Sequence, residues 1–113
     1  MDRLLTFVEL APFNESRSEH FTDSSFRELQ HELTMDPEAG DIMVGTGGCR
    51  KLRFASKKRN KGKSGGIRII YFFRSKSDRI YLIDVIDKVN QANITDEQAR
   101  QLKRLTSLLG EEL

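Results

Sequence analysis

The chain has 113 residues, of which 37% are hydrophobic and 32% charged, and its formal net charge is +2. This composition, with a mean hydropathy of −0.53, suits a soluble globular domain and argues against wholesale disorder. The length suits one domain, residues 1–113, and no apolar run approaches the ~20 residues that a membrane-spanning helix needs.

The first residues and the cysteine and histidine counts indicate the compartment of the protein and the kinds of site that it can hold. MDRLLTFVEL contains Asp2 and Glu9 and lacks the long apolar segment of a signal peptide. One cysteine excludes an internal disulfide, and two histidines argue against a structural zinc site. We therefore expect a cytoplasmic protein with no metal or other cofactor and no contact with a membrane.

The positive charge is gathered in one quarter of the chain. No Asp or Glu lies between residues 50 and 74, whereas the other 88 residues carry nine basic and seventeen acidic side chains. The ten basic residues of this segment are Arg50, Lys51, Arg53, Lys57, Lys58, Arg59, Lys61, Lys63, Arg68 and Arg74. Such a basic face attracts polyanions, of which nucleic acid is the commonest.

In chain order, the first expected element is a strand over residues 4–10, which Pro12 ends or places at a sheet edge. A helix then begins after Thr22, the expected N-cap, with Phe21 and Phe26 in the positions of a hydrophobic staple. Its apolar stripe consists of Phe26, Leu29 and Leu33. Residues 36–40, which include a proline, end this helix.

Three strands are expected next, over residues 50–55, 67–73 and 79–87, and the charged segment 56–66 is expected to be a mobile loop. The last helix begins at Thr95, where Gln98 completes a capping box, and its apolar stripe is Leu102, Leu105 and Leu109. The order β-α-β-β-β-α predicts a small α+β domain with helices packed on an antiparallel sheet of the last three strands.

Side-chain alternation along these strands predicts two different sheet faces. The apolar face, toward the first helix, carries Leu52, Phe54, Ile67, Ile69, Tyr71, Phe73, Tyr81, Ile83 and Val85. The opposite face carries Lys51, Arg53, Arg68, Asp84 and Lys88 among Ile70, Phe72, Ile80, Leu82 and Ile86. Four cations beside one carboxylate repel one another, and a bound anion would relieve that repulsion.

Plainer interpretations of these residues stay open at this point. Arg68 could pair with Asp84 in a salt bridge, and Lys51 and Arg53 could be edge-strand charges that prevent aggregation. The segment 57–63 could be a solvated loop and Lys88 ordinary surface. We further expect Tyr71 and Tyr81 in the core, His20 and His31 on the surface, and Cys49 without a reactive thiolate.

Residues 47–54 (GGCRKLRF) and 62–71 (GKSGGIRIIY) resemble the RelE/HigB family of type II toxins, most closely its HigB-like branch. Residues 7–10, 26–30, 37–41 and 87–95 are similar to that branch too, so the resemblance covers nearly the whole chain. It implies the RelE-like fold and a ribosome-dependent endoribonuclease that cuts mRNA in the decoding site without a metal. It also implies a cognate antitoxin, a helix-turn-helix protein encoded beside the toxin, through which the pair binds operator DNA.

The resemblance assigns roles to residues that the alternation had already singled out. Lys51 and Arg53 match the family's basic pair, Arg68 its central-strand arginine, and Lys88 the basic residue that ends the last strand. The chemistry of RNA cleavage suggests a role for each residue: Arg68, assisted by Arg53, would stabilise charge on the reacting phosphate. Lys51 would act as the base, and Lys88 would contact phosphate or donate a proton. RNA or the ribosome would be bound by Arg50, Lys57, Lys58, Arg59, Lys61 and Lys63.

The chain departs from the family pattern at its tyrosines. Many members carry a tyrosine where Ile86 stands, and some carry a catalytic tyrosine at the C-terminus, whereas this chain ends in LGEEL. Two other functions therefore compete with the nuclease. One is a non-catalytic module of the RelE/ParE fold that binds RNA or poisons another target such as DNA gyrase, and the other is a general RNA-binding protein.

Overall fold

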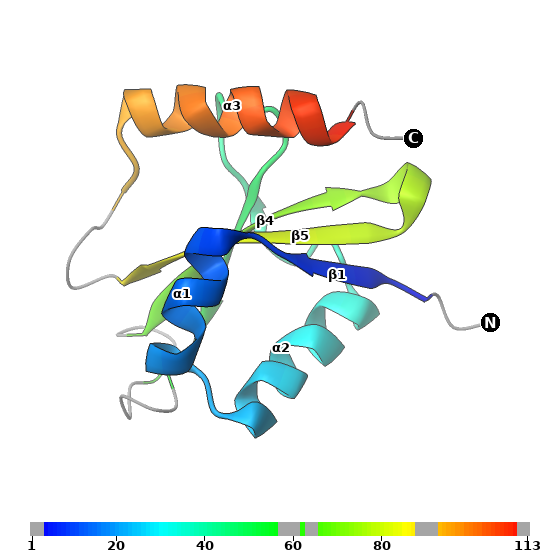
Figure 1. Cartoon of the computed structure of the whole chain (residues 1–113), viewed down its shortest axis with the longest axis vertical. Coiled ribbons are helices and arrows are strands. Elements are labelled where there is room, and N and C mark those ends of the chain that lie inside the picture. Colours follow the sequence, from blue (N-terminus) through cyan, green and yellow to red (C-terminus); the bar gives the residue numbers. More distant parts are fainter. Residues whose placement is uncertain (1–3, 57–61, 63–65, 88–92, 111–113) are drawn as a thin grey trace.

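Five strands form one sheet in the computed structural model, and three α-helices flank it (Figure 1). The structure describes residues 4–56, 62, 66–87 and 93–110. In chain order the elements are β1 (Thr6–Glu9), α1 (Ala11–His20), α2 (Asp23–Met35), β2 (Asp41–Ile42), β3 (Arg50–Phe54), β4 (Ile67–Arg74), the 3-10 turn η2 (Ser75–Ser77), β5 (Arg79–Asp87) and α3 (Asp96–Gly110). No helix within the described ranges is both long and apolar enough to cross a membrane.

The strand order is β1-β5-β4-β3-β2. The antiparallel pairing of β3, β4 and β5 confirms the expected sheet, and the domain is α+β as predicted. Two features differ from the expectation: β1 joins the edge parallel to β5, and the two-residue β2 extends the other edge. The sheet is therefore mixed: β1 and β5 are parallel, and the other neighbouring strands are antiparallel. This arises because α1 and α2 connect β1, at one edge of the sheet, to β2 at the other edge.

Helices cover both faces of the sheet, so the domain has two apolar clusters (Figure 1). The first cluster lies under α2 and combines Phe26, Leu29 and Leu33 with inward residues of β3, β4 and β5. The second lies under α3, where Leu109 is buried and Leu102 and Leu105 are partly buried. The three leucines expected as the stripe of the last helix thus pack as predicted.

The starts of α2 and α3 confirm their sequence signals. The Thr22 hydroxyl accepts a 3.0 Å hydrogen bond from the Ser25 amide, and Ser25 Oγ accepts one of 2.9 Å from the Thr22 amide. Thr95 and Gln98 form the same reciprocal pair at α3, with distances of 2.9 and 3.1 Å. Each capping box satisfies amides that the first helical turn leaves without an intrahelical partner.

Residues 11–20 form α1, a helix that the sequence analysis did not predict. Pro12 lies in its first turn, where the missing N–H removes no hydrogen bond, so this proline begins a helix instead of ending a strand. Phe13 and His20 are the buried residues of α1, and so sparse a stripe gives little helical periodicity. His20 is 3% exposed, so its expected surface position was wrong, whereas His31 is exposed as predicted.

A β-bulge interrupts the alternation of β5. Ile70 pairs with Asp84, but Tyr71 pairs with Leu82, so Ile83 is an extra residue in β5. Residues before the bulge therefore face the opposite way from the prediction. Ile80 and Leu82 join Val85 in the cluster under α2, whereas Tyr81 and Ile83 join Ile86 under α3.

Candidate functional site

Three cationic side chains lie on the α3 side of the sheet, in two neighbouring rows. In the first row Asp41, Lys51, Ile70 and Asp84 are register partners across β2, β3, β4 and β5. In the second row Arg53, Arg68 and Ile86 are partners across β3, β4 and β5. The structure thus brings Lys51, Arg53 and Arg68 together with Asp84 on one face, as the alternation predicted.

Arg53 and Arg68 stand directly opposite each other on β3 and β4. Arg53 is exposed, whereas Arg68 is 7% exposed and its Nη1 donates a 3.2 Å hydrogen bond to the Ile67 carbonyl. Burial, followed by the charge of Arg53, lowers the pKa of Arg68. Like charges placed opposite each other destabilise a sheet, so this pair favours the binding of an anion.

Asp84 is not the salt-bridge partner of Arg68. Its Oδ1 accepts a 2.7 Å hydrogen bond from the Val85 amide, and no ion pair joins Asp84 to Arg68, both of which the structure describes. Burial raises the pKa of the Asp84 carboxyl; the Val85 amide opposes this shift, and the charge of Glu15 adds to it. Asp84 is therefore a half-buried acidic group beside three cations that it does not neutralise by direct pairing.

Arg50 lies on the other face, away from the three cations. Its Nη1 donates to the Gly40 carbonyl at 2.8 Å, and its Nη2 forms a 3.1 Å ion pair with Glu38. Tyr71 binds the same turn, because its hydroxyl donates to the Pro37 carbonyl at 2.8 Å and accepts from the Gly40 amide at 2.9 Å. Arg50 thus holds the segment that connects α2 to β2, a position that its place in β3, one residue before Lys51, already implies.

Several sequence-predicted residues lie outside the described ranges. They are Lys57, Lys58, Arg59, Lys61, Lys63 and Lys88. Among the residues that the structure does describe, Tyr71 and Tyr81 are buried as expected. Cys49 is 0% exposed, and burial raises its thiol pKa to about 11, in line with the unreactive thiol that we predicted. The described side chains contain no group of three or more His, Cys, Asp or Glu arranged to hold a metal ion.

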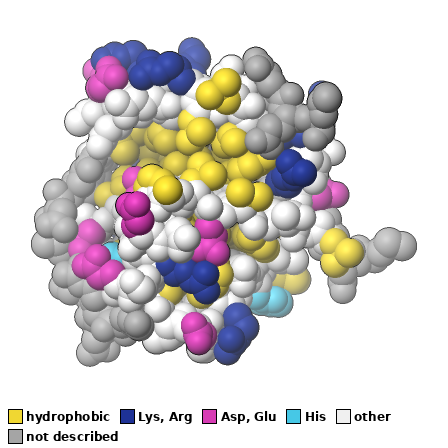
Figure 2. Space-filling view, viewed as in Figure 1, with side chains coloured by type: hydrophobic (Ala, Val, Ile, Leu, Met, Phe, Trp, Pro, Cys, Tyr) yellow, Lys and Arg dark blue, Asp and Glu magenta, His cyan; other side chains and the backbone are white. Residues whose placement is uncertain are grey.

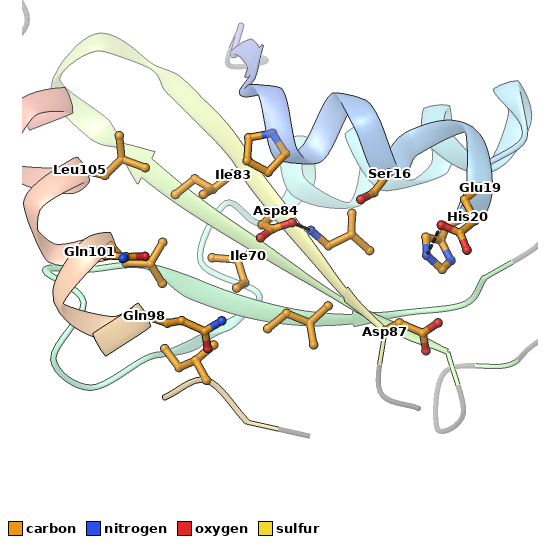
Figure 3. A pocket seen from close by; sticks show the side chains of 15 residues that line it. Ser16, Glu19, His20, Ile70, Ile83, Asp84, Asp87, Gln98, Gln101 and Leu105 are labelled. Carbon is orange, nitrogen blue, oxygen red and sulfur yellow. Dashed lines mark hydrogen bonds and ion pairs between the residues drawn. The ribbon is translucent and has the colours of Figure 1, made fainter. Parts of the chain in front are cut away.

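A groove of about 510 Å³ runs between α1, β5 and α3, and we call it the α1–α3 groove. Ser16, Glu19 and His20 line it from α1, and Gln98, Gln101 and Leu105 line it from α3 (Figure 3). Strand residues lie between these walls, namely Ile70, Ile83, Asp84, Val85, Ile86 and Asp87. Figure 2 shows hydrophobic side chains gathered on this face between α3 and the sheet, with charged groups around them.

A smaller hollow of about 300 Å³ shares Ile86 and Ile94 with the groove and is lined by Lys51. The groove therefore lies next to a hollow that Lys51 lines.

The sequence analysis missed the contribution of α1 to this groove. His20 Nδ1 lies 2.9 Å from Ser56 Oγ in a buried hydrogen bond that connects the end of α1 to the second residue after β3. Its Nε2 lies 3.9 Å from the Glu19 carboxylate. No periodicity signal placed His20 inside the domain, because α1 itself was not expected.

Solved structures show what this arrangement of elements is similar to. A mutant of the E. coli toxin RelE with two arginines changed to alanine, in the free state, has a TM-score of 0.55 at 15% identity, covering 81% of this chain and 90% of that chain. Isolated E. coli RelE has a TM-score of 0.52 at 16% identity, with 90% and 99% covered. A chain of the intact E. coli RelBE toxin–antitoxin complex also scores 0.52 at 16% identity, with 74% and 96% covered.

The similarity at this identity concerns the fold, and no protein-family model matches the sequence. The structural similarity extends over most of this chain and most of each RelE chain. The chain therefore has the fold of the RelE-like toxins, as its sequence resemblance implied.

Proposed function

We propose that this chain is the toxin of a type II toxin–antitoxin system, of the HigB-like branch, and that it cleaves mRNA in the decoding site of the ribosome. A cognate antitoxin neutralises it, and the pair binds operator DNA through that antitoxin. The RelE-like fold supports the toxin assignment, since one similar structure is a toxin–antitoxin complex.

One observation carries the nuclease proposal: the Arg53–Arg68 pair faces the same side of the sheet as Lys51. Two arginines that stand directly opposite each other in a sheet repel, and this repulsion lowers the stability of the fold. A phosphate between them gains charge-assisted hydrogen bonds from both guanidinium groups. The same arrangement suits a transition state in which the phosphate carries additional negative charge.

In the proposed reaction the RNA 2′-hydroxyl attacks the adjacent phosphorus, and the bond from phosphorus to the leaving 5′-oxygen breaks. Arg68, with Arg53, stabilises the charge on the phosphorane oxygens, because a guanidinium binds two oxygens at once and stays protonated. Lys51 takes the proton of the 2′-hydroxyl, and Lys88 contacts the phosphate or donates a proton to the 5′-oxygen. The basic residues between 57 and 63 hold the RNA backbone or the ribosome, so binding weakens as salt rises.

Primer extension on a defined mRNA paused on purified ribosomes tests this proposal. The reactions contain the wild type, Arg68→Ala, or the wild type without ribosomes. Arg27→Ala is the matched control, because Arg27 is an exposed arginine on α2, away from the cationic face. We expect cuts in the decoding-site codon from the wild type and from Arg27→Ala, and none from folded Arg68→Ala or without ribosomes.

The other outcomes separate the competing functions. Normal cleavage by Arg68→Ala would remove Arg68 from the site. Growth arrest without any cut by a folded wild type would favour the non-catalytic module, including one that poisons DNA gyrase. Salt-sensitive binding to free RNA without growth arrest would favour a general RNA-binding protein.

A further inference from the structure

The α1–α3 groove begins where the cationic face ends. Asp84 lies in the same row as Lys51 and Ile70, and Ile86 lies in the row of Arg68. Neighbouring strands are about 4.8 Å apart, so Asp84 on β5 is one strand spacing from the strand of Arg68 and two from that of Lys51. A phosphate held by the arginines is therefore about one strand spacing from Ile86 and Asp84, which line the groove.

Part of the wall of the groove is apolar and suits the flat face of a base, while Ser16, Glu19, His20, Asp87, Gln98 and Gln101 line the rest. Ile70, Ile83 and Ile86 come from the sheet, and Leu102 and Leu105 come from α3. Among the described residues that line the groove there is no Lys or Arg, so it offers no side chain of these two types to pair with a backbone phosphate. A volume of about 510 Å³ is in the range of small-ligand pockets.

Asp84 presents a defined hydrogen-bonding edge beside these apolar residues (Figure 3). The Val85 amide fixes its Oδ1 at 2.7 Å, and an ionised carboxylate only accepts hydrogen bonds. Guanine has two adjacent N–H donors on its Watson–Crick edge, at N1 and N2, which match the two oxygens of a carboxylate. Adenine, cytosine and uracil each place an acceptor next to their donor, and that acceptor repels the second oxygen.

We propose that the α1–α3 groove binds a nucleobase of the RNA substrate and that Asp84 makes guanine the preferred base. This rests on the proposed function, because it takes RNA as the substrate of the cationic face. Asp84 is then a specificity-determining residue: it contacts the base, while the arginines contact the phosphate.

Calorimetric titration with the four nucleoside 3′-monophosphates tests the proposal without ribosomes or cleavage. For the wild type we expect 3′-GMP to bind about tenfold more tightly than 3′-UMP, the discrimination typical of one bidentate base contact. Asp84→Asn keeps an acceptor oxygen for the Val85 amide but replaces the second oxygen by a donor. We expect this variant to lose the preference for 3′-GMP while it still binds all four nucleotides through their phosphate.

Two controls identify the source of each effect. Glu28→Gln removes an exposed carboxylate from α2 and should leave the preference for 3′-GMP unchanged. Arg68→Ala should weaken the binding of all four nucleotides to a similar extent. Equal affinity of the wild type for the four nucleotides, no binding of any of them, or an unchanged preference in Asp84→Asn would each overturn the proposal.

Sequencing of the cut sites on ribosomes then separates this inference from the proposed function. A guanine bias of the wild-type cuts that disappears in Asp84→Asn supports both. A nucleotide preference in the titration without any cut mRNA contradicts the nuclease but leaves the base pocket in place. Cuts without base bias, together with equal nucleotide affinities, contradict the base pocket and leave the nuclease in place.

Discussion

The Thr106 hydroxyl donates a 2.9 Å hydrogen bond to the Thr46 carbonyl, and both residues are buried. The bond connects α3 to the glycine-rich turn before β3, across 60 positions of the sequence. Thr46 in turn organises that turn, because its hydroxyl donates to the Met43 carbonyl at 2.6 Å and accepts from the Cys49 amide at 3.1 Å. The last helix is thereby fastened to the segment that leads into the cationic strand.

We expect Thr106→Val to lower the free energy of unfolding by about 1–3 kcal/mol, because it leaves the buried Thr46 carbonyl without this donor. Valine keeps the shape of the side chain, so the loss reports the hydrogen bond. Urea unfolding followed by circular dichroism measures it. Ser107→Ala, at an exposed position of the same helix, should change the stability little. Equal effects of the two substitutions would contradict the role of the Thr106 bond.

Removing Arg53 should stabilise the fold while it weakens anion binding. Arg53→Gln eliminates the charge opposite Arg68, and we expect the free energy of unfolding to rise by about 0.5 kcal/mol, the size of a cross-strand charge effect. The gain should shrink at high salt, which screens the repulsion. Arg27→Gln, which removes an exposed arginine from α2, is the control for net charge. An equal gain from the control would assign the effect to net charge and not to the Arg53–Arg68 pair.

The raised pKa of Asp84 predicts that ionisation of this carboxyl lowers the free energy of unfolding, to an extent that depends on pH. Its pKa is raised in the folded state, so the ionised carboxylate is less favourable there than in the unfolded chain. This loss of unfolding free energy is absent below the ordinary aspartate pKa of about 3.9 and grows as the pH rises toward the pKa of Asp84 in the folded state. Above the folded-state pKa the loss has its full size and no longer changes with pH.

We therefore expect Asp84→Asn to be more stable than the wild type near pH 7 and equally stable once the pH falls below the ordinary aspartate range. Urea midpoints across this range measure the difference. Glu15, Glu19, Asp87 and His20 are further ionisable groups in or near the α1–α3 groove, so each variant is compared with the wild type at the same pH. A stability gain that stays constant down to the lowest pH would contradict the prediction.

Cys49 should resist alkylation as long as the domain is folded. Its thiol is buried and its pKa is raised to about 11, so little thiolate exists near pH 8. We expect iodoacetamide to modify the native protein far more slowly than the protein in urea, as followed by mass spectrometry. Modification of the native protein at the rate of the unfolded chain would show that the turn around Cys49 opens readily.

Local signals in the sequence were sufficient for the parts of the fold that depend on neighbouring residues. The capping boxes at Thr22 and Thr95 and the alternation of residues 50–54 each follow from short-range geometry, and each is present in the structure. The same alternation placed Lys51, Arg53 and Arg68 on one face. It did so because β3 and the first half of β4 contain no irregularity.

The remaining features depend on contacts that no local pattern encodes. The parallel pairing of β1 with β5 and the burial of His20 against Ser56 join segments that are far apart in the sequence. The groove needs α1 beside β5, and α1 has too few buried residues to show a helical stripe. Arg50 was grouped with the RNA-binding residues by its charge, although its position in β3 turns it toward Glu38.

Because Ile83 is an extra residue, the side chains of β5 before and after it alternate between the two faces in different registers. Its first part supplies apolar side chains to α2, and its second part supplies a carboxylate to the groove. Deleting Ile83 would leave Leu82 under α2 and Asp84 in the groove, because these two residues already pair with neighbouring residues of β4, Tyr71 and Ile70. The deletion would restore regular alternation along β5 and remove one apolar side chain from the groove. The bulge thus adds the side chain of Ile83 to the groove while Leu82 and Asp84 keep the faces that their partners on β4 dictate.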